Sequence, residues 1–154
     1  MIKDVEKTIR DYIAQVIHVS LATCFNNQPW VCEVHYAYDQ DLNLYFRSLQ
    51  STRHSQEIAQ NPNVAGNIVE PHGLTDKPRG VYFEGKAELL DDVKPSDKAV
   101  IALNDRFNLG QEVLDEARSK DGHKIYKISV SKFYLFDTRE STPSRKYELP
   151  WAKF

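Results

Sequence analysis

The segment Asn43-Leu-Tyr-Phe-Arg-Ser-Leu-Gln-Ser-Thr-Arg-His-Ser-Gln-Glu-Ile-Ala-Gln-Asn-Pro62 contains a predicted strand, a polar turn and a predicted helix in succession. Apolar and polar residues alternate from Leu42 through Arg47, which is the pattern of a half-buried strand. Hydroxyl and amide side chains follow over residues 48–52 and favour a turn. A helix is then predicted over 52–60, ending where Pro62 prevents its continuation. Polar side chains at the end of a strand are thereby brought to the start of a helix.

This junction carries residues that can bind an anion: Arg47 and Ser48 at the strand end, and Thr52, Arg53 and His54 at the helix start. The first N–H groups of a helix lack intrahelical acceptors, and the helix dipole attracts negative charge to them. An arginine side chain adds a bidentate grip on a phosphate. The alternative is that Thr52 only caps the helix, with Arg53 and His54 solvated on its surface.

The composition is that of one domain spanning residues 1–154. A net charge of −2 argues against bulk binding to nucleic acid or to an anionic membrane. No apolar run is long enough to span a bilayer, and residues 1–7 lack the apolar core of a signal peptide. We therefore expect a cytoplasmic protein with no nucleic-acid or membrane partner.

Two cysteines, Cys24 and Cys32, are expected on adjacent strands of one hairpin. Their spacing fits neither a zinc knuckle nor a redox motif. In a reducing cytosol they are interpreted as small buried apolar residues. A zinc site that combines them with His18 or His35 is the alternative.

The remaining periodicity predicts a small antiparallel barrel. Strands are predicted at 18–25, 30–38, 42–48, 64–69, 81–90 and 124–136, and helices at 2–17, 52–60 and 95–118, the last broken at 108–110. Six strands with few helices, mainly β with flanking helices (α+β), are typical of a closed or partly closed barrel. The tail 137–154 ends in apolar residues that include Trp151 and Phe154. We expect it to pack on the barrel or on a partner subunit, with the partner favoured.

The order of these pieces resembles the FMN-binding split-barrel superfamily, the pyridoxamine 5′-phosphate oxidase-like group, and in particular its small members grouped with general stress proteins. The matching pieces are His18-Val-Ser-Leu-Ala-Thr23, Leu44-Tyr-Phe-Arg-Ser48, Ser51-Thr-Arg-His54, Asn61-Pro-Asn-Val-Ala65 and Gly80-Val-Tyr-Phe-Glu-Gly-Lys-Ala-Glu-Leu-Leu90. They run in order over most of the chain.

The resemblance implies a six-stranded antiparallel split barrel that forms a homodimer with FMN at the subunit interface. Carried over by position, Arg47, Ser48, Thr52, Arg53 and His54 would hold the FMN phosphate. The family usually has Lys or Arg where this chain has His54, so the resemblance also implies that phosphate binding depends on pH.

The resemblance places the second strand beside the flavin ring. Glu33, Val34, His35 and Tyr36 would meet the ring edge, mainly through backbone groups. The alternatives are a sheet histidine at His35 and a core aromatic residue at Tyr36. Residues 30–38 contain no Lys or Arg, which argues against pyridoxamine phosphate as the substrate.

The function implied is an FMN-dependent oxidoreductase that takes hydride from a nicotinamide or from another small molecule. The flavin supplies the chemistry, and no catalytic side chain or metal site is assigned. One alternative is a flavin-binding store or redox sensor without turnover. Another is a haem-binding split barrel, whose axial ligand would be one of His18, His35, His72 and His123.

Overall fold

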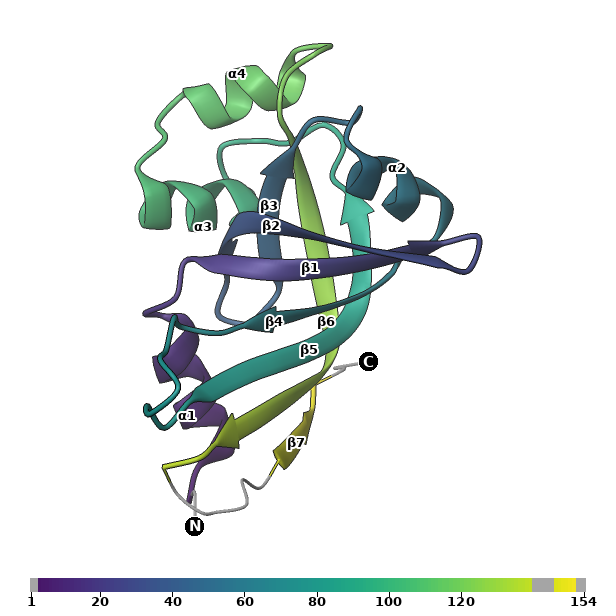
Figure 1. Ribbon diagram of the computed structural model, residues 1–154. Helices are drawn as coiled ribbons and strands as arrows, with labels where there is room; N and C mark the ends of the chain where they lie inside the picture. Colours follow the sequence, from purple (N-terminus) through teal and green to yellow (C-terminus); the bar gives the residue numbers. More distant parts are fainter. Residues whose placement is uncertain (1–2, 140–145, 152–154) are drawn as a thin grey trace.

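The computed structural model describes residues 3–139 and 146–151. Within these ranges the elements are α1 (Val5–Ile13), β1 (His18–Phe25), β2 (Gln28–Tyr38), β3 (Leu44–Ser48), α2 (Arg53–Gln60), β4 (Asn63–Ile68), β5 (Arg79–Leu89), α3 (Lys98–Phe107), α4 (Glu112–Arg118), β6 (Lys124–Asp137) and β7 (Lys146–Pro150) (Figure 1). No helix in the described ranges is long and apolar enough to cross a membrane.

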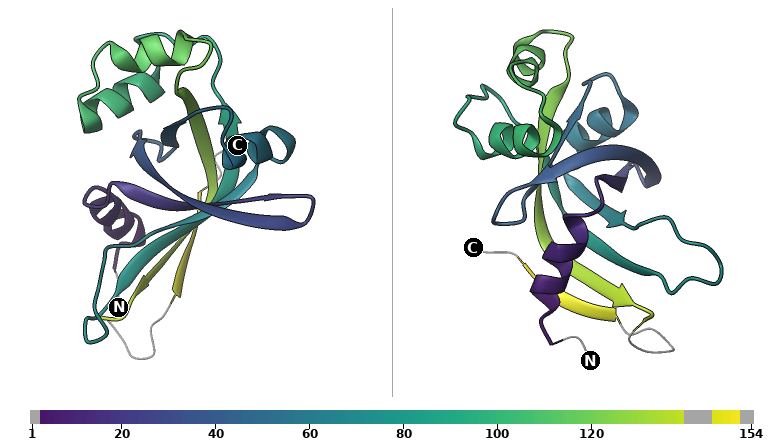
Figure 2. Two further views of the ribbon diagram at one scale, coloured as in Figure 1. Left: turned by 45° about the horizontal axis from the view of Figure 1, so that its top comes forward. Right: turned by 90° about the vertical axis from the view of Figure 1, so that its left-hand side faces the viewer.

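The strands form one antiparallel sheet in the order β3-β2-β1-β4-β5-β6-β7. Additional pairing of β3 with β6 closes the first six of these strands into a ring. The predicted six-stranded antiparallel barrel is therefore confirmed. The far half of the long strand β6 leaves the ring and pairs with β7, a strand that the sequence did not predict. Helices α3 and α4 lie together at one end of the barrel, and α1 lies toward the other (Figure 2).

Three element boundaries differ from the prediction for identifiable reasons. Helix α1 ends at Ile13 instead of residue 17, and Arg106 of α3 donates to the carbonyl oxygens of Ile13 and Val16 at 2.9 and 2.8 Å. Strand β2 begins at residue 28, because residues 26 and 27 both have positive φ and make a two-residue hairpin turn. Strand β3 begins at residue 44, because Leu42 has a φ of 57° and belongs to the preceding turn.

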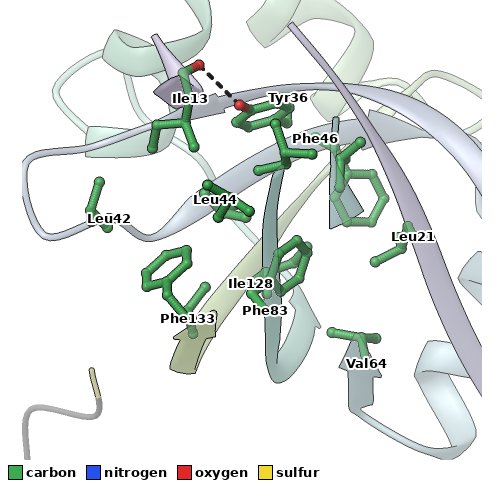
Figure 3. Packing of buried hydrophobic residues seen from close by; sticks show 14 of the residues in the cluster. Ile13, Leu21, Tyr36, Leu42, Leu44, Phe46, Val64, Phe83, Ile128 and Phe133 are labelled. Atoms are coloured by element: carbon green, nitrogen blue, oxygen red, sulfur yellow. Dashed lines mark hydrogen bonds between the residues drawn. The ribbon is translucent and has the colours of Figure 1, made fainter. Parts of the chain in front are cut away.

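Two hydrophobic clusters share the sheet. The larger fills the barrel and contains Leu21, Leu44, Phe46, Phe83, Ile128 and Phe133, each almost fully buried (Figure 3). Burying side chains of this size stabilises the fold by roughly 1.5–3 kcal/mol each. Tyr36 joins this cluster and donates its hydroxyl to the carbonyl of Ile13 at 3.0 Å (Figure 3). The smaller cluster lies between α3, α4 and the outer face of β3, where Tyr45 and Val100 are buried. Because side chains of β3 point alternately to its two faces, as predicted, this strand contributes residues to both hydrophobic clusters.

The part of the tail that the structure describes packs on its own barrel. Trp151 is 9% exposed, meets Phe133 edge-on at 6.0 Å and donates its indole N–H to the carbonyl of Asp41 at 2.6 Å. The guanidinium of Arg10 lies 5.5 Å from the Trp151 ring. Phe154 lies outside the described residues. Trp151 therefore connects the turn between β2 and β3 to strand β6.

A bulge in β5 depends on glycine. The pairing of β5 with β6 shifts register between Glu84 and Gly85, and a Cβ on Gly85 would overlap the carbonyl oxygen of Ser129. We expect Gly85→Ala to lower the free energy of unfolding by about 1–3 kcal/mol, the usual cost of overpacking. Gly73→Ala is the matched control, because only an Asp76 carboxylate oxygen at 3.4 Å faces that position closely. It should change stability by less than about 0.5 kcal/mol in urea denaturation. Equal effects of the two variants would contradict this account of the bulge.

Candidate functional site

A cleft of about 650 Å³ opens where β3 ends and α2 begins. Its lining residues are Ile17, Glu33, Val34, His35, Arg47, Ser48, Leu49, Thr52, His54, Leu103, Phe107, Leu109 and His123. All the site residues predicted from the sequence are in this lining except Arg53 and Tyr36. Residues predicted from two separate segments are therefore brought together in space.

A hydrogen-bonded cluster of Ser48, Thr52 and His54 forms the base of the cleft. Nε2 of His54 lies 2.7 Å from the Ser48 hydroxyl and 3.2 Å from the Thr52 hydroxyl. Ser48 and His54 are 5% and 9% exposed. Burial lowers the pKa of His54 below its usual value, and the nearby Glu57 carboxylate opposes that effect. The imidazole is therefore neutral near pH 7 in the ligand-free protein.

Arg47 brings a guanidinium to the same place from the end of β3. Its Nε is buried and has no hydrogen-bond partner among the described residues. A terminal nitrogen of the side chain lies 3.6 Å from a carboxylate oxygen of Glu112 on α4, which is 63% exposed. A buried donor without an acceptor is costly, so an anion in the cleft would relieve that cost.

The start of α2 adds backbone donors. Thr52 is the N-cap, and its side chain accepts from the N–H of Ser55. The N–H groups of Arg53 and His54, in the first turn, have no acceptor within the helix. The positive end of the helix dipole therefore lies beside Arg47 and the two hydroxyls.

The side chain of Arg53 lies outside the cleft. Its Nε donates to Glu57 at 2.9 Å, and its guanidinium stacks 4.3 Å from the centre of the Trp30 ring. Glu57 is 7% exposed and also accepts from the Thr23 hydroxyl at 3.4 Å. Arg53 thus ties α2 to the β1–β2 hairpin and borders a separate groove. Its predicted contact with a phosphate is untested and remains a prediction.

Of the four site residues predicted on β2, three line the cleft and one lies in the hydrophobic core. Glu33 accepts from the Ser20 hydroxyl at 2.7 Å, and the His35 ring meets Phe107 edge-on at 5.9 Å. Tyr36 points into the barrel, where burial raises the pKa of its phenol. Its backbone N–H is also taken, since it donates to the carbonyl of Ile17 at 3.1 Å. The Tyr36 side chain therefore does not reach the cleft.

Several lining residues were not predicted as part of the flavin site, although His123 was considered as a haem ligand. Leu103, Phe107 and Leu109 come from α3 and the loop after it and form an apolar wall. His123 stands just before β6, and its Nδ1 lies 2.8 Å from Oε2 of Glu116 on α4. The break at 108–110 signalled a loop between two helices, but no local pattern showed that this loop covers β3.

Of the four histidines considered as haem ligands, two line the cleft and two do not. His35 and His123 line the cleft, whereas His18 lies 3.9 Å from Glu33 and is not in the lining. His72 is exposed in the loop between β4 and β5. Only the first two therefore share a cavity with Arg47.

Cys24 and Cys32 are free thiols on opposite faces of the hairpin. Cys32 pairs with Leu21 across the two strands, and Cys24 lies three residues further along β1. Among the described residues no group of three or more His, Cys, Asp or Glu is arranged to hold a metal ion. The zinc alternative therefore finds no support.

A second cavity of about 780 Å³ lies beside Trp151, over β4, β5 and β6. It is larger than the cleft, and Lys86 and Lys127 line it. It contains neither a helix start nor an unpartnered buried donor among the described residues. The cleft at the β3–α2 junction is therefore the better candidate site.

A six-stranded antiparallel ring extended by a further strand, with a cleft at a strand–helix junction, defines the protein as a split barrel. The family model described as pyridoxamine 5′-phosphate oxidase matches residues 5–137, and the chain belongs to this family. The chain is 31% identical over 85 residues to the UPF0306 protein PM1958 of Pasteurella multocida (strain Pm70). That alignment covers 54% of this chain and 57% of the relative, so the match extends over little more than half of its length.

Solved structures share the fold at low sequence identity. A conserved hypothetical protein from Mycobacterium tuberculosis matches with a TM-score of 0.74 and 19% identity over 99% of this chain and 93% of its own. A heme binding protein from Mycobacterium smegmatis matches with a TM-score of 0.74 and 16% identity, over 97% of this chain and 59% of its own. A FAD-binding protein from Mesorhizobium loti matches with a TM-score of 0.60 and 20% identity over 84% of this chain and 90% of its own.

The buried, neutral state of His54 predicts how stability depends on pH. Because its pKa is lower in the folded protein than in the unfolded chain, its contribution is complete above the unfolded value of about 6.5 and is lost as pH falls below it. His54→Gln should therefore lose less stability than the wild type between pH 7.5 and 5. Thermal unfolding of both proteins in matched buffers measures the difference. Parallel stability curves over this range would contradict the prediction.

Proposed function

We propose that the protein binds FMN in the cleft and acts as an FMN-dependent oxidoreductase on a small molecule. The observation that carries this proposal is the buried Nε of Arg47, which has no acceptor among the described residues and belongs to the same cleft as two hydroxyls and the start of a helix. A phosphate is the anion best matched to that donor set, because it offers several strong acceptor oxygens. The electron donor is a nicotinamide or another oxidisable small molecule.

The rest of the cleft suits the flavin ring. Glu33, Val34 and His35 form one side of the lining, and Leu103 and Phe107 are among the apolar residues of its wall. A pocket of this size with a few convergent polar groups is typical of cofactor sites. FMN, when bound, supplies hydride and electron transfer. The chain's own residues bind the phosphate, orient the ring and exclude water from it.

Arg53 is the one predicted phosphate contact that must move. Its ion pair with the buried Glu57 and its stacking on Trp30 hold it away from the cleft. We therefore assign the phosphate primarily to Arg47, Ser48, Thr52 and the backbone of α2. A contact by Arg53 would require exchange of its Glu57 partner for the phosphate.

We further propose that the protein is a homodimer with the cleft at the subunit interface. Among the described residues, β2 pairs with β3 only over 36–38, so the edge from Gln28 to His35 faces no neighbouring strand. The same region exposes Trp30 by 40% and Val31 by 60%. A second copy is the natural cover for an unpaired edge with exposed apolar residues beside the site. The free thiols suit a reducing compartment such as the cytoplasm.

Haem is the second candidate cofactor, because His35 and His123 line the same cleft as Arg47. An imidazole ligates haem iron, and an arginine pairs with a haem carboxylate. The structural neighbour from Mycobacterium smegmatis is a heme binding protein.

A flavin store without turnover uses the same contacts as the enzyme and differs only in its reaction. Absorbance spectra separate haem from flavin, and bleaching of bound FMN by NADH or NADPH without oxygen separates the enzyme from the store.

The phosphate assignment predicts the effect of Arg47→Ala on flavin binding. Losing a charge-assisted contact of about 1.5–3 kcal/mol should weaken FMN binding by roughly 10–100-fold. Riboflavin, which lacks the phosphate, should bind both proteins with similar affinity. Flavin fluorescence titration measures both ligands, and Arg53→Ala is the matched control with an expected smaller loss. An unchanged FMN affinity in Arg47→Ala, or no FMN binding to the wild type, would overturn the proposed site.

The dimer proposal predicts that Val31→Lys dissociates the protein. A lysine at this exposed edge position places like charges close together across a symmetric interface. Light scattering should show a dimer for the wild type and a monomer for the variant, with weaker FMN binding by the monomer. A wild-type monomer that binds FMN with full affinity would exclude the interface.

A further inference from the structure

The cleft has too little permanent positive charge for a doubly charged phosphate. Among the described residues, Arg47 is the only arginine or lysine in its lining, and Glu33 contributes a carboxylate. Glu112 already lies 3.6 Å from Arg47. Arg53, the other nearby arginine, is paired with Glu57 outside the cleft. A bound dianion would therefore face one cation that is already shared with a carboxylate.

Two of the three imidazoles in the lining lie near the end of β3, where further charge can form. His54 lies at the base of the cleft, with Nε2 2.7 Å from the Ser48 hydroxyl. His123 lies at its rim, immediately before Lys124, which pairs with Ser48 across β3 and β6. The β3–β6 register thus brings both rings to the end of β3. Histidine is the side chain whose charge changes most readily near neutral pH.

His123 is held in a fixed orientation by Glu116. Its Nδ1 and its backbone N–H both lie 2.8 Å from the same carboxylate oxygen. A carboxylate only accepts, so Nδ1 carries the hydrogen and Nε2 is left to meet a ligand. Gly122 allows this approach, because a Cβ there would overlap the carbonyl oxygen of Glu116.

Charged and titratable groups surround the two imidazoles on every packed element. They are Glu57 on α2, Arg47 on β3, Glu33 and His35 on β2, and Glu112 and Glu116 on α4. The amine of Lys124 is turned away, toward the carbonyl oxygens of Ala117 and Ser119. Carboxylates thus outnumber the permanent cation around the cleft. That balance disfavours a dianion that arrives without protons.

We propose that His54 and His123 take up protons when a phosphate-bearing ligand enters the cleft, so that two imidazolium rings and Arg47 hold the dianion together. This inference rests on the proposed FMN site and specifies how that site is charged. It makes His123 a ligand contact and Glu116 the residue that positions it. In the absence of ligand His54 stays neutral, because burial lowers its pKa.

Proton uptake makes affinity depend on pH in a defined direction. Each linked proton raises the dissociation constant by up to about tenfold per pH unit, in the range above the free and below the bound pKa of its ring. FMN binding should therefore weaken as pH rises from 7 to 8.5. Riboflavin carries no phosphate, so its affinity should stay nearly constant over the same range.

Isothermal titration calorimetry of the full chain with FMN tests the inference. At pH 8, in Tris and in HEPES, the phosphate itself is fully ionised, since its second pKa is about 6. The difference in heat between the two buffers then gives the number of protons taken up from them. Riboflavin is the matched ligand. His123→Asn is the test variant and His72→Asn the matched control, because His72 is exposed in the β4–β5 loop.

We expect the wild type and His72→Asn to take up more than one proton with FMN and none with riboflavin. His123→Asn should take up about one proton fewer with FMN. FMN binding without proton uptake, or equal uptake by His123→Asn and the wild type, would overturn this inference alone. Absence of FMN binding to the wild type would overturn the proposed function and, with it, this inference.

Discussion

The pairing of β3 with β6 is the constraint on which the rest of the structure depends. It closes the six-stranded ring and pairs the edges of β3 and β6 over residues 44–48 and 124–128, which an open sheet would expose. It also fixes what meets at the end of β3, because Ser48 lies opposite Lys124. The start of α2 and the loop that carries His123 are therefore brought to one place. A register shift of one residue would turn Arg47 from the outer face of β3 into the barrel.

Two glutamates determine the different roles of the two arginines. Glu57 is buried, lies 2.9 Å from Arg53 and receives a further hydrogen bond, so separating that pair would leave a buried charge uncompensated. Glu112 is 63% exposed and lies 3.6 Å from Arg47, and ion pairs of that kind contribute at most about 1 kcal/mol. Arg47 can therefore exchange its partner for a ligand at little cost. The ion pair with Glu57 keeps Arg53 in place. The stacking of Arg53 on Trp30 also connects α2 to the β1–β2 hairpin.

Local patterns predicted the barrel and the strand–helix junction at the candidate cleft, because both depend on short-range periodicity. The alternation through β3 and the cap at Thr52 are properties of neighbouring residues, and both are present in the structure. The failures depend on distant partners. Arg106 ends α1 early by taking carbonyl oxygens some ninety positions away. The turn of Arg53 toward Trp30, and the cover that α3 provides over β2 and β3, follow from packing that no local window contains.

The same physical features suit the cleft to either of the two proposed cofactors. A flat apolar ring with an acidic group at one end describes both flavin nucleotides and haem, and the cleft offers an apolar wall beside an arginine. On the proposals made above, the cleft would accept a ring with one anionic end, and the histidines in its lining would decide between flavin and haem. An imidazole nitrogen that carries a proton cannot ligate iron. On these proposals, flavin binding would require a proton on Nε2 of His123, whereas haem binding through His123 would require iron at the same atom.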